Sequence, residues 1–561
     1  MAGPTAASES AAQRRGTFDM TRQGGNRRVS SGSSSGRSGG RRFGAGHVLA
    51  GLALVVILIS GAIVWSTLAD GCGGNRKTVS VMTDSDMAGV VKDLAGQASD
   101  NSCYDYRVSA TPNIEAPSKL TGNSRTDLWL ADSPTRARRV IQQVRLQTDY
   151  VSKSLASSPV MVVGTTLRES KTWVDVMRIE NLQVGNPLES ATGDAPIVGG
   201  VASVATGQAS PTGLKQAMVT MVTTRLNLAP GQDTDEARLK LADSSVTPVV
   251  ASEQQYLAYL RTHKTSKLTA QTPRAGTVAL TYPLLNTADS GRKDIAAKAG
   301  AALVAAAATD KGRKAINDAG YRNPDGSGVG DDVPLLKYDD ETQIDKALAS
   351  WQTIGVPTRT LQVLDTSGSM RTPAGNSTRA QLLADATVEG IKLPGRNAQI
   401  GTWIFGIDKG GKGQDWREIT PVKRLDDMST GTLHRDLVTR TTLAALKNDL
   451  GGGTGLYDST LAAYKHMVDT YDPAATNAIV IATDGRNEDA QSITLDDLIG
   501  QLKALYDPAR PVQILTLGLT DDADADALKK IADAVGGVTY IARTPSDIKN
   551  IFTSERIRMM D

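Results

Sequence analysis

Short runs of apolar residues recur along the second half of the chain, separated by stretches of helical length. Five of these runs are nearly continuous, at 359–365, 399–406, 477–484, 512–519 and 537–543. Such runs are typical of parallel strands that are covered on both faces. Helical segments lie between them, at 379–392, 456–471, 495–506 and 527–535. The pattern predicts a doubly wound α/β domain over residues 355–556.

The first half of the chain also alternates apolar runs with helical segments. Its runs lie at 78–84, 104–110, 127–132 and 159–164, which favours a parallel α/β organisation. Helical composition dominates from about 235 to 350, and the alanine-rich stretch 294–318 predicts one helix. The Gly- and Asp-rich stretch 323–334 is typical of turns near the edge of a domain. We therefore predict a first α/β domain over residues 75–345.

The N-terminal segment has a different composition. Residues 1–45 contain eight arginines and two acidic residues among Ser and Gly, which predicts a disordered basic tail. The run 47–69 has 23 residues and no Asp, Glu, Lys or Arg, which is long enough for a helix to cross a bilayer. We predict a transmembrane helix at 46–69. The arginine excess before it predicts a single-pass protein of the cell membrane, with a cytoplasmic N-terminus and extracytoplasmic domains.

Two alternatives to a retained membrane helix stay open. The run could be part of a cleaved signal peptide, because TLA at 67–69 resembles a cleavage site. Lipidation at Cys72 is the other. Cys72 and Cys103 are the two cysteines of the chain, and both follow the predicted helix. An oxidising exterior favours a disulfide between them over two free thiols.

Charge and residue types exclude several function classes. The formal net charge is +2, so no general basic field would attract nucleic acid. The four histidines show neither metal-binding nor triad spacing, and no set of nucleophile, base and orienting residue is evident. We therefore expect a protein that is not an enzyme.

Several segments of the first half follow one another in a characteristic order. They are TDLWLADS (126–133), SLASSPVMVVG (154–164), ASPTGLKQA (209–217), TYPLL (281–285) and DKGRKAINDAGYR (310–322). In this order the segments resemble bacterial extracellular solute-binding domains of the periplasmic-binding-protein type. The resemblance implies two lobes with a cleft for a small solute between them.

Polar residues at expected strand-to-helix turns are candidates for lining this cleft. They are Thr83, Asp84, Ser133, Ser158 and Thr212. Backbone N–H groups at such turns can bind an anion. Each of these side chains could instead be an ordinary helix N-cap.

A second group of polar residues follows the strands of the second half. Asp365, Ser367 and Ser369 follow its first strand, Thr454 lies in the glycine-rich loop 451–455, and Asp484 follows its most apolar strand. The carboxyl ends of parallel strands meet at one edge, so these side chains should lie close together. All of them offer oxygen, which favours Mg²⁺, Mn²⁺ or Ca²⁺ over zinc or copper.

The same residues match a known pattern. DTSGS at 365–369 resembles the D-x-S-x-S motif of the von Willebrand factor A family and its metal-ion-dependent adhesion site. Thr454 resembles that family's loop threonine, and Asp484 its distal aspartate. The resemblance implies that Ser367, Ser369 and Thr454 contact Mg²⁺, while Asp365 and Asp484 act directly or through water. The alternative is that these residues only cap helices.

Two functions are consistent with these patterns. The first is a membrane-anchored binding or adhesion protein that holds an acidic protein partner through a divalent cation. The alternative is the solute-binding component of a transport system, in which the von Willebrand-like domain is accessory.

Overall fold

The computed structural model describes most of the chain after residue 71. The described residues are 72, 76–122, 125–228, 233–338, 340–520, 522–544, 547, 550, 551, 554, 557, 558 and 560. The predicted basic tail at 1–45 and the predicted membrane helix at 46–69 lie outside them. Among the described helices, none combines the length and apolar character that a membrane span requires.

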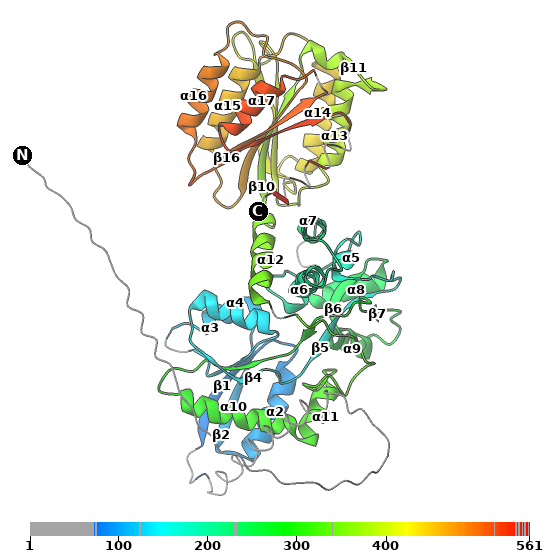
Figure 1. Ribbon diagram of the computed structural model, residues 1–561, viewed down its shortest axis with the longest axis vertical. Coiled ribbons are helices and arrows are strands. Elements are labelled where there is room, and N and C mark those ends of the chain that lie inside the picture. Colours follow the sequence, from blue (N-terminus) through cyan, green and yellow to red (C-terminus); the bar gives the residue numbers. More distant parts are fainter. Residues whose placement is uncertain are drawn as a thin grey trace, which may run out of the picture. The chain divides into compact units, whose positions relative to one another are not determined.

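A five-stranded sheet forms the first lobe (Figure 1). Its strand order is β2 (Tyr104–Ala110), β1 (Lys77–Thr83), β3 (Leu128–Leu130), β9 (Leu284–Asn286) and β4 (Asp149–Ser152). Strand β1 is parallel to β2 and β3, whereas β9 is antiparallel to β3 and β4. The helices of this lobe are α2 (Ala88–Asp100), α3 (Ala116–Lys119), α4 (Pro134–Val144), α10 (Lys293–Ala308) and α11 (Asp310–Asp318), with the short 3-10 helix η1 (Asn113–Glu115) before α3.

The second lobe is built around β5 (Ser158–Gly164), which is buried along its whole length. Strands β6 (Val249–Ser252), β7 (Thr269–Gln271) and β8 (Ala279–Leu280) all pair with β5 in antiparallel fashion. The parallel pairing predicted for this apolar run is therefore wrong, because burial on both faces does not determine strand direction. The helices here are α5 (Trp173–Met177), α6 (Ala191–Ala205), α7 (Pro211–Leu226), α8 (Asp235–Ser244) and α9 (Glu253–Thr262).

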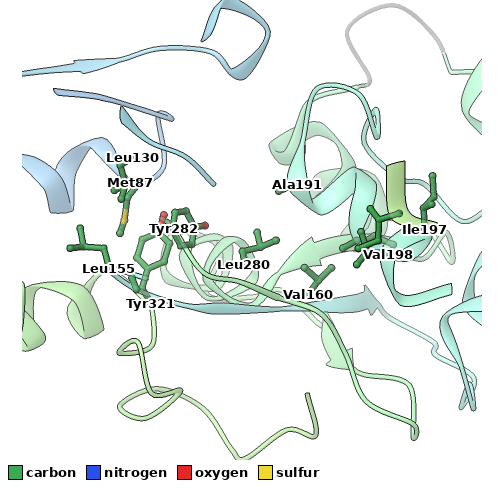
Figure 2. Packing of buried hydrophobic residues seen from close by; sticks show 14 of the residues in the cluster. Met87, Leu130, Leu155, Val160, Ala191, Ile197, Val198, Leu280, Tyr282 and Tyr321 are labelled. Atoms are coloured by element: carbon green, nitrogen blue, oxygen red, sulfur yellow. The ribbon is translucent and has the colours of Figure 1, made fainter. Parts of the chain in front are cut away.

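The chain crosses between the two lobes more than once. One crossing lies between β4 and β5, and another lies between β8 and β9, where the Leu155 N–H donates to the Tyr282 carbonyl at 3.0 Å. Tyr282 also packs edge-to-face on Tyr321, with ring centroids 5.2 Å apart. Figure 2 shows both rings beside Leu155 and Met87 in the shared core. This arrangement confirms the predicted two-lobed, periplasmic-binding-protein-like fold.

The alanine-rich stretch 294–318 forms two helices instead of the predicted single one. Helix α10 ends at Ala308 and α11 begins at Asp310. Thr309 between them has an extended backbone, and its hydroxyl accepts from the Gly312 N–H at 2.9 Å. A threonine N-cap therefore interrupts a sequence whose composition favours an unbroken helix.

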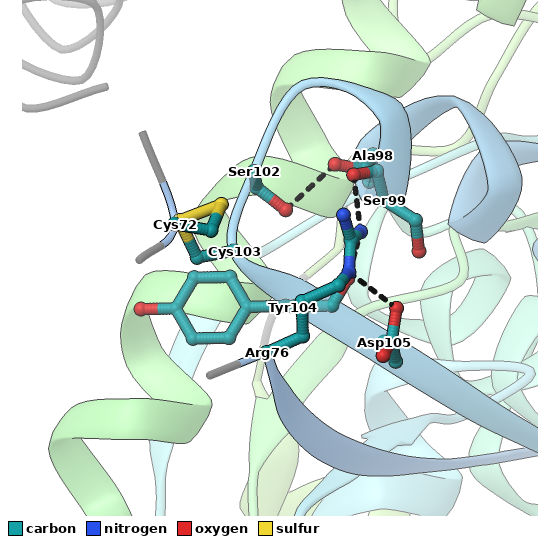
Figure 3. Close-up of a disulfide and its surroundings, with 8 residues drawn as sticks. All are labelled: Cys72, Arg76, Ala98, Ser99, Ser102, Cys103, Tyr104 and Asp105. Atoms are coloured by element: carbon teal, nitrogen blue, oxygen red, sulfur yellow. Dashed lines mark hydrogen bonds and ion pairs between the residues drawn. A yellow bond between two sulfur atoms is a disulfide. The ribbon is translucent and has the colours of Figure 1, made fainter. Parts of the chain in front are cut away.

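The predicted disulfide between Cys72 and Cys103 is present (Figure 3). It links the segment before β1 to the loop between α2 and β2. Nearby, the Arg76 side chain pairs with Asp105 at 2.7 Å, and the Ser102 hydroxyl donates to the Ala98 carbonyl at 2.6 Å. The bond thus fastens the start of the first lobe to its edge strand.

The second domain contains a six-stranded sheet. Its order is β14 (Trp416–Arg424), β13 (Gln399–Phe405), β10 (Thr358–Asp365), β15 (Thr476–Thr483), β16 (Val512–Leu519) and β17 (Val538–Ala542). The five predicted runs form the parallel strands β10, β13, β15, β16 and β17. Strand β14 is an antiparallel edge strand that we did not predict, because half-exposed and charged residues fill much of it.

Helices cover both faces of this sheet (Figure 1). Leu361 and Val363 of β10 belong to one core with residues of α15 (Leu456–Asp469), α16 (Leu495–Leu505) and α17 (Ala525–Asp533). Leu364 belongs to another core with residues of α13 (Arg379–Gly390) and α14 (His434–Asn448). The alternation of side chains along a strand explains this division. The remaining elements are α12 (Glu341–Ile354), η2 (Gly368–Arg371) and the short pair β11 (Pro373–Ala374) and β12 (Ser377–Thr378).

Candidate functional site

Asp365 is the last residue of β10 and is fully buried. One carboxylate oxygen accepts from the Ser367 N–H at 2.7 Å, and the other accepts from the Thr483 hydroxyl at 2.5 Å. Burial raises the pKa of Asp365 to about 6, although these hydrogen bonds oppose the shift. The carboxylate is therefore held in a fixed orientation at the carboxyl edge of the sheet.

The two predicted serines link Asp365 to Asp484. The Ser367 and Ser369 hydroxyl oxygens lie 2.9 Å apart, and the Ser369 hydroxyl donates to an Asp484 carboxylate oxygen at 2.8 Å. Asp484 directly follows β15 and is buried. Ser369 and Asp484 are 115 positions apart in the sequence and meet at one edge of the sheet, as predicted from their positions after strands.

Thr454 lies at the same point. A Cβ atom placed on Gly485 would lie 3.3 Å from the Thr454 hydroxyl oxygen and 3.9 Å from that of Ser369. Glu488 holds the backbone of Thr454 in place. The Thr454 N–H donates to the Glu488 carboxylate at 3.0 Å, and the Thr454 carbonyl accepts from the Glu488 N–H at 2.8 Å. All five residues predicted to hold a cation are therefore brought together.

Arg379 is part of this site and was missed by the sequence reasoning. It begins α13, is buried, and pairs with the second Asp484 oxygen at 2.7 Å. Its guanidinium also pairs with Asp522, which is exposed. No motif marks Arg379 in the sequence, because its position at the site depends on how α13 packs. It neutralises one of the two carboxylates.

The donor set fits a hard cation. Two carboxylates and three hydroxyls supply oxygen alone, which suits Mg²⁺, Mn²⁺ or Ca²⁺. The serine hydroxyls now bond to each other and to Asp484, and such hydroxyls can turn their lone pairs toward an ion. Arg379 is paired to Asp484, whereas no residue in the described part of the chain forms a salt bridge with Asp365.

The first domain contains a cavity of about 440 Å³ that residues of both lobes line. Acidic side chains dominate its lining: Asp84, Asp86, Asp132, Glu189, Asp233, Asp235 and Glu236. Arg238 is the one basic residue among the lining residues, and it is already paired with Asp233 and Asp235. Tyr282 adds an aromatic ring.

Of the five residues predicted for the cleft, Asp84 lines this cavity. Thr83 is buried at the end of β1, and Ser133 caps α4 by accepting from the Arg136 N–H at 3.1 Å. The Ser158 hydroxyl accepts from the Gln254 N–H at 3.0 Å, and Thr212 is exposed in the first turn of α7, which Ser210 caps. The acidic lining would also repel an anion, the kind of ligand that the predicted strand-to-helix turns suggested.

Several acidic groups of this cleft are incompletely paired. Within the described part of the chain, one oxygen of Asp84 and one of Asp132 are buried without a hydrogen-bond partner, and Asp132 is 6% exposed. Burial, reinforced by Asp86 and Asp132, raises the pKa of Asp84 to about 7. Burial also raises the pKa of the neighbouring Asp194 to about 8, although Arg136 opposes this shift. A cation would stabilise the ionised form of these groups.

Comparisons with known proteins show which proteins this chain is similar to. No protein with a curated description matches the chain. Among solved structures, von Willebrand factor type A from Catenulispora acidiphila is 22% identical over 36% of this chain and 43% of its own, with a TM-score of 0.29. This chain therefore spans less than half of that relative.

Two further solved structures align with about half of the chain. The sulfate-binding protein SubI from Mycobacterium tuberculosis H37Rv is 17% identical over 44% of this chain and 88% of its own, with a TM-score of 0.35. A periplasmic thiamin binding protein is 12% identical over 50% and 95%, with a TM-score of 0.38. Residues 79–322, which make up most of the first domain and less than half of the chain, match the family model described as bacterial extracellular solute-binding protein.

Proposed function

We propose that the protein is an extracytoplasmic binding protein whose second domain holds an acidic protein partner through a divalent cation. The observation that carries this proposal is the meeting of Asp365, Ser367, Ser369 and Asp484, linked by contacts of 2.7 to 2.9 Å, with Thr454 beside them. The second domain is then a von Willebrand factor A domain, and Mg²⁺ is the expected ion.

The charges at the site support partner binding. Mg²⁺ prefers six oxygen ligands and keeps exchangeable water when the protein supplies few strong ones. Arg379 already neutralises Asp484, so Asp365 offers the main compensating charge and a bound Mg²⁺ would keep net positive charge. A carboxylate from another protein could then displace a bound water. The disulfide fits an oxidising exterior, and the predicted helix at 46–69 would anchor the protein in the membrane.

Mn²⁺ in place of Mg²⁺ tests this function in the full-length protein. Water-proton relaxation should increase when Mn²⁺ binds, and should fall when a glutamate-rich peptide displaces the bound water. Asp365→Asn should weaken Mn²⁺ binding by about 100-fold, since it removes the main charged ligand without changing the side chain's size. Asp385→Asn, on the exposed side of α13, is the control. Equal Mn²⁺ binding by wild type and Asp365→Asn would refute the proposal.

Solute capture by the first domain is a second candidate function, and the acidic cavity favours it. A volume of about 440 Å³ is more than one metal ion needs, and a set of carboxylates beside Tyr282 suits a small organic cation. The protein would then deliver this solute to a transport system. Calorimetry of the full-length protein with amines, guanidines and matched anions tests this function. Selective anion binding would contradict it.

A further inference from the structure

The second domain contains a separate group of three carboxylates. Asp415 directly precedes β14, Asp458 lies in the first turn of α15, and Asp489 lies in the loop after β15. One oxygen from each lies within 4.8 Å of the others. The three residues lie at least 31 positions apart in the sequence, and only the fold brings them together. No sequence motif therefore marks them.

Asp415 is the most constrained member of this group. It is 5% exposed, and one oxygen accepts from the Asp408 N–H at 3.0 Å. The other oxygen is buried and has no hydrogen-bond partner among the residues that the structure describes. It faces the N-terminus of α15, because a Cβ atom on Gly455 would meet it. Burial raises the pKa of Asp415, and repulsion from Asp489 and Asp458 raises it further.

The other two carboxylates keep free lone pairs. One oxygen of Asp489 accepts from the Gln491 N–H at 2.9 Å, and one of Asp458 accepts from the Ile493 N–H at 3.5 Å. Among the described residues, none forms a salt bridge with any of the three. The helix N-terminus offers Asp458 only about half a unit of positive charge. The group therefore lacks the positive charge that three close carboxylates require.

We propose that Asp415, Asp458 and Asp489 bind one Ca²⁺ ion, at a site that shares no ligand with the five residues around Asp365. The number of carboxylates favours Ca²⁺ over Mg²⁺. Mg²⁺ is usually bound through one or two carboxylates and keeps several waters, whereas Ca²⁺ accepts about six to eight oxygen ligands in a flexible arrangement. One oxygen from each of the three aspartates lies within 4.8 Å of the others, close enough to contact one ion.

Such an ion would connect two of the loops that carry the five residues around Asp365, which we call the first site. Asp458 belongs to the helix that follows Thr454, and Asp489 follows Glu488, which holds the Thr454 backbone at 2.8 and 3.0 Å. Ca²⁺ bound by Asp415, Asp458 and Asp489 would therefore restrain both loops.

The test measures Ca²⁺ binding by calorimetry in full-length Asp365→Asn protein, so that the first site cannot contribute. We expect binding with a dissociation constant of about 0.1–1 mM, as in extracellular calcium modules. Adding Asp489→Asn should weaken it at least tenfold, whereas adding Asp496→Asn, an exposed first-turn aspartate of α16, should leave it unchanged. Asp458→Asn serves as a second variant if Asp489→Asn does not fold.

Thermal unfolding provides an independent measurement. Ca²⁺ should raise the melting temperature of the Asp365→Asn protein, and Asp489→Asn should abolish this response without lowering the melting temperature in EDTA, since it removes repulsion. Absence of Ca²⁺ binding in Asp365→Asn, or a rise of the second domain's melting temperature with Ca²⁺ that persists after Asp489→Asn, overturns the proposal. Because Asp365 is replaced throughout, neither result depends on whether the first site binds Mg²⁺.

Discussion

At the scale of single residues, Arg379 controls the charge of the first site. Its ion pair with Asp484 is buried, and removing one partner of a buried pair commonly costs about 3–5 kcal/mol. Arg379→Met should therefore destabilise the second domain in EDTA. The same change removes a positive charge from the cation site, so Mg²⁺ should bind about tenfold more tightly and restore part of the lost stability.

Thermal unfolding of Arg379→Met with Mg²⁺ or EDTA measures both effects. Arg371→Met is the matched control, because Arg371 is exposed and donates to the Leu450 carbonyl instead of a carboxylate. An Arg379→Met protein whose Mg²⁺ affinity equals that of the wild type would show that Arg379 does not oppose the cation.

Asp84 gives the first domain a predictable pH dependence. Its folded pKa of about 7 exceeds its usual value of 3.8, so the folded state binds the proton more tightly than the unfolded state. This contribution to stability is complete below about pH 4 and is lost as the pH rises through 7. Asp86 and Asp132 face the same group and shift in the same direction.

Asp84→Asn should therefore stabilise the first domain at pH 8, by roughly 1–3 kcal/mol, and by a smaller amount at pH 5, where the folded state keeps the proton on Asp84. The amide oxygen can still accept from the Met87 N–H, a bond of 2.9 Å in the wild type. Urea unfolding at both pH values provides the measurement, with the exposed Asp93→Asn of α2 as the control. A variant that is less stable at pH 8 would contradict the direction of the pKa shift.

At the scale of elements, the sequence predicts buried strands best. The five apolar runs of the second domain became its five parallel strands, since only a strand between two helical layers needs so continuous an apolar run. Strand β14 escaped prediction because it lies at an edge, where charged residues are tolerated. The break at Thr309 was not predicted, because the alanine-rich composition favours one continuous helix. The Thr-Asp pair is nevertheless a recognised helix start.

Some residues of the candidate site could be predicted from the sequence, and others could not. Asp365, Ser367, Ser369, Thr454 and Asp484 could be predicted because each follows a strand or precedes a helix at the same edge. Arg379 and Glu488 could not be predicted, because packing alone brings their side chains there. The same holds for Asp415 in the separate group of three carboxylates. The acidic lining of the cavity in the first domain was missed for that reason too, since its residues come from both lobes.

The break between α10 and α11 can be tested directly. Thr309→Ala removes the hydroxyl that accepts from Gly312, so the first domain should lose about 1 kcal/mol of stability. Thr309→Ser should retain most of it, because serine caps equally well. Ser244→Ala, which removes an exposed hydroxyl at the end of α8, is the control for urea unfolding. Equal losses for Thr309→Ala and Ser244→Ala would mean that the cap contributes nothing.

At the scale of the whole molecule, each domain has hydrophobic cores of its own. Val79, Leu128 and Trp173 belong to the core of the first domain, whereas Leu361 and Ile479 belong to one core of the second. Separate cores of this size usually unfold in separate transitions. The two domains also carry different stabilising devices, because the disulfide lies in the first and the predicted Mg²⁺ site lies in the second.

Calorimetric scanning of the full-length protein should therefore show two transitions that respond to different reagents. Reduction removes a link between residues 31 positions apart, which should cost the first domain about 3–4 kcal/mol and lower its transition by roughly 5–10 °C. Cys72→Ser with Cys103→Ser should reproduce this shift without reductant. In a buffer that contains Mg²⁺ and no Ca²⁺, EDTA should instead lower the second transition, and only when Asp365 is intact. A reductant that moved both transitions equally would show that the domains unfold as one unit, because a local link can stabilise a distant core only through cooperative unfolding.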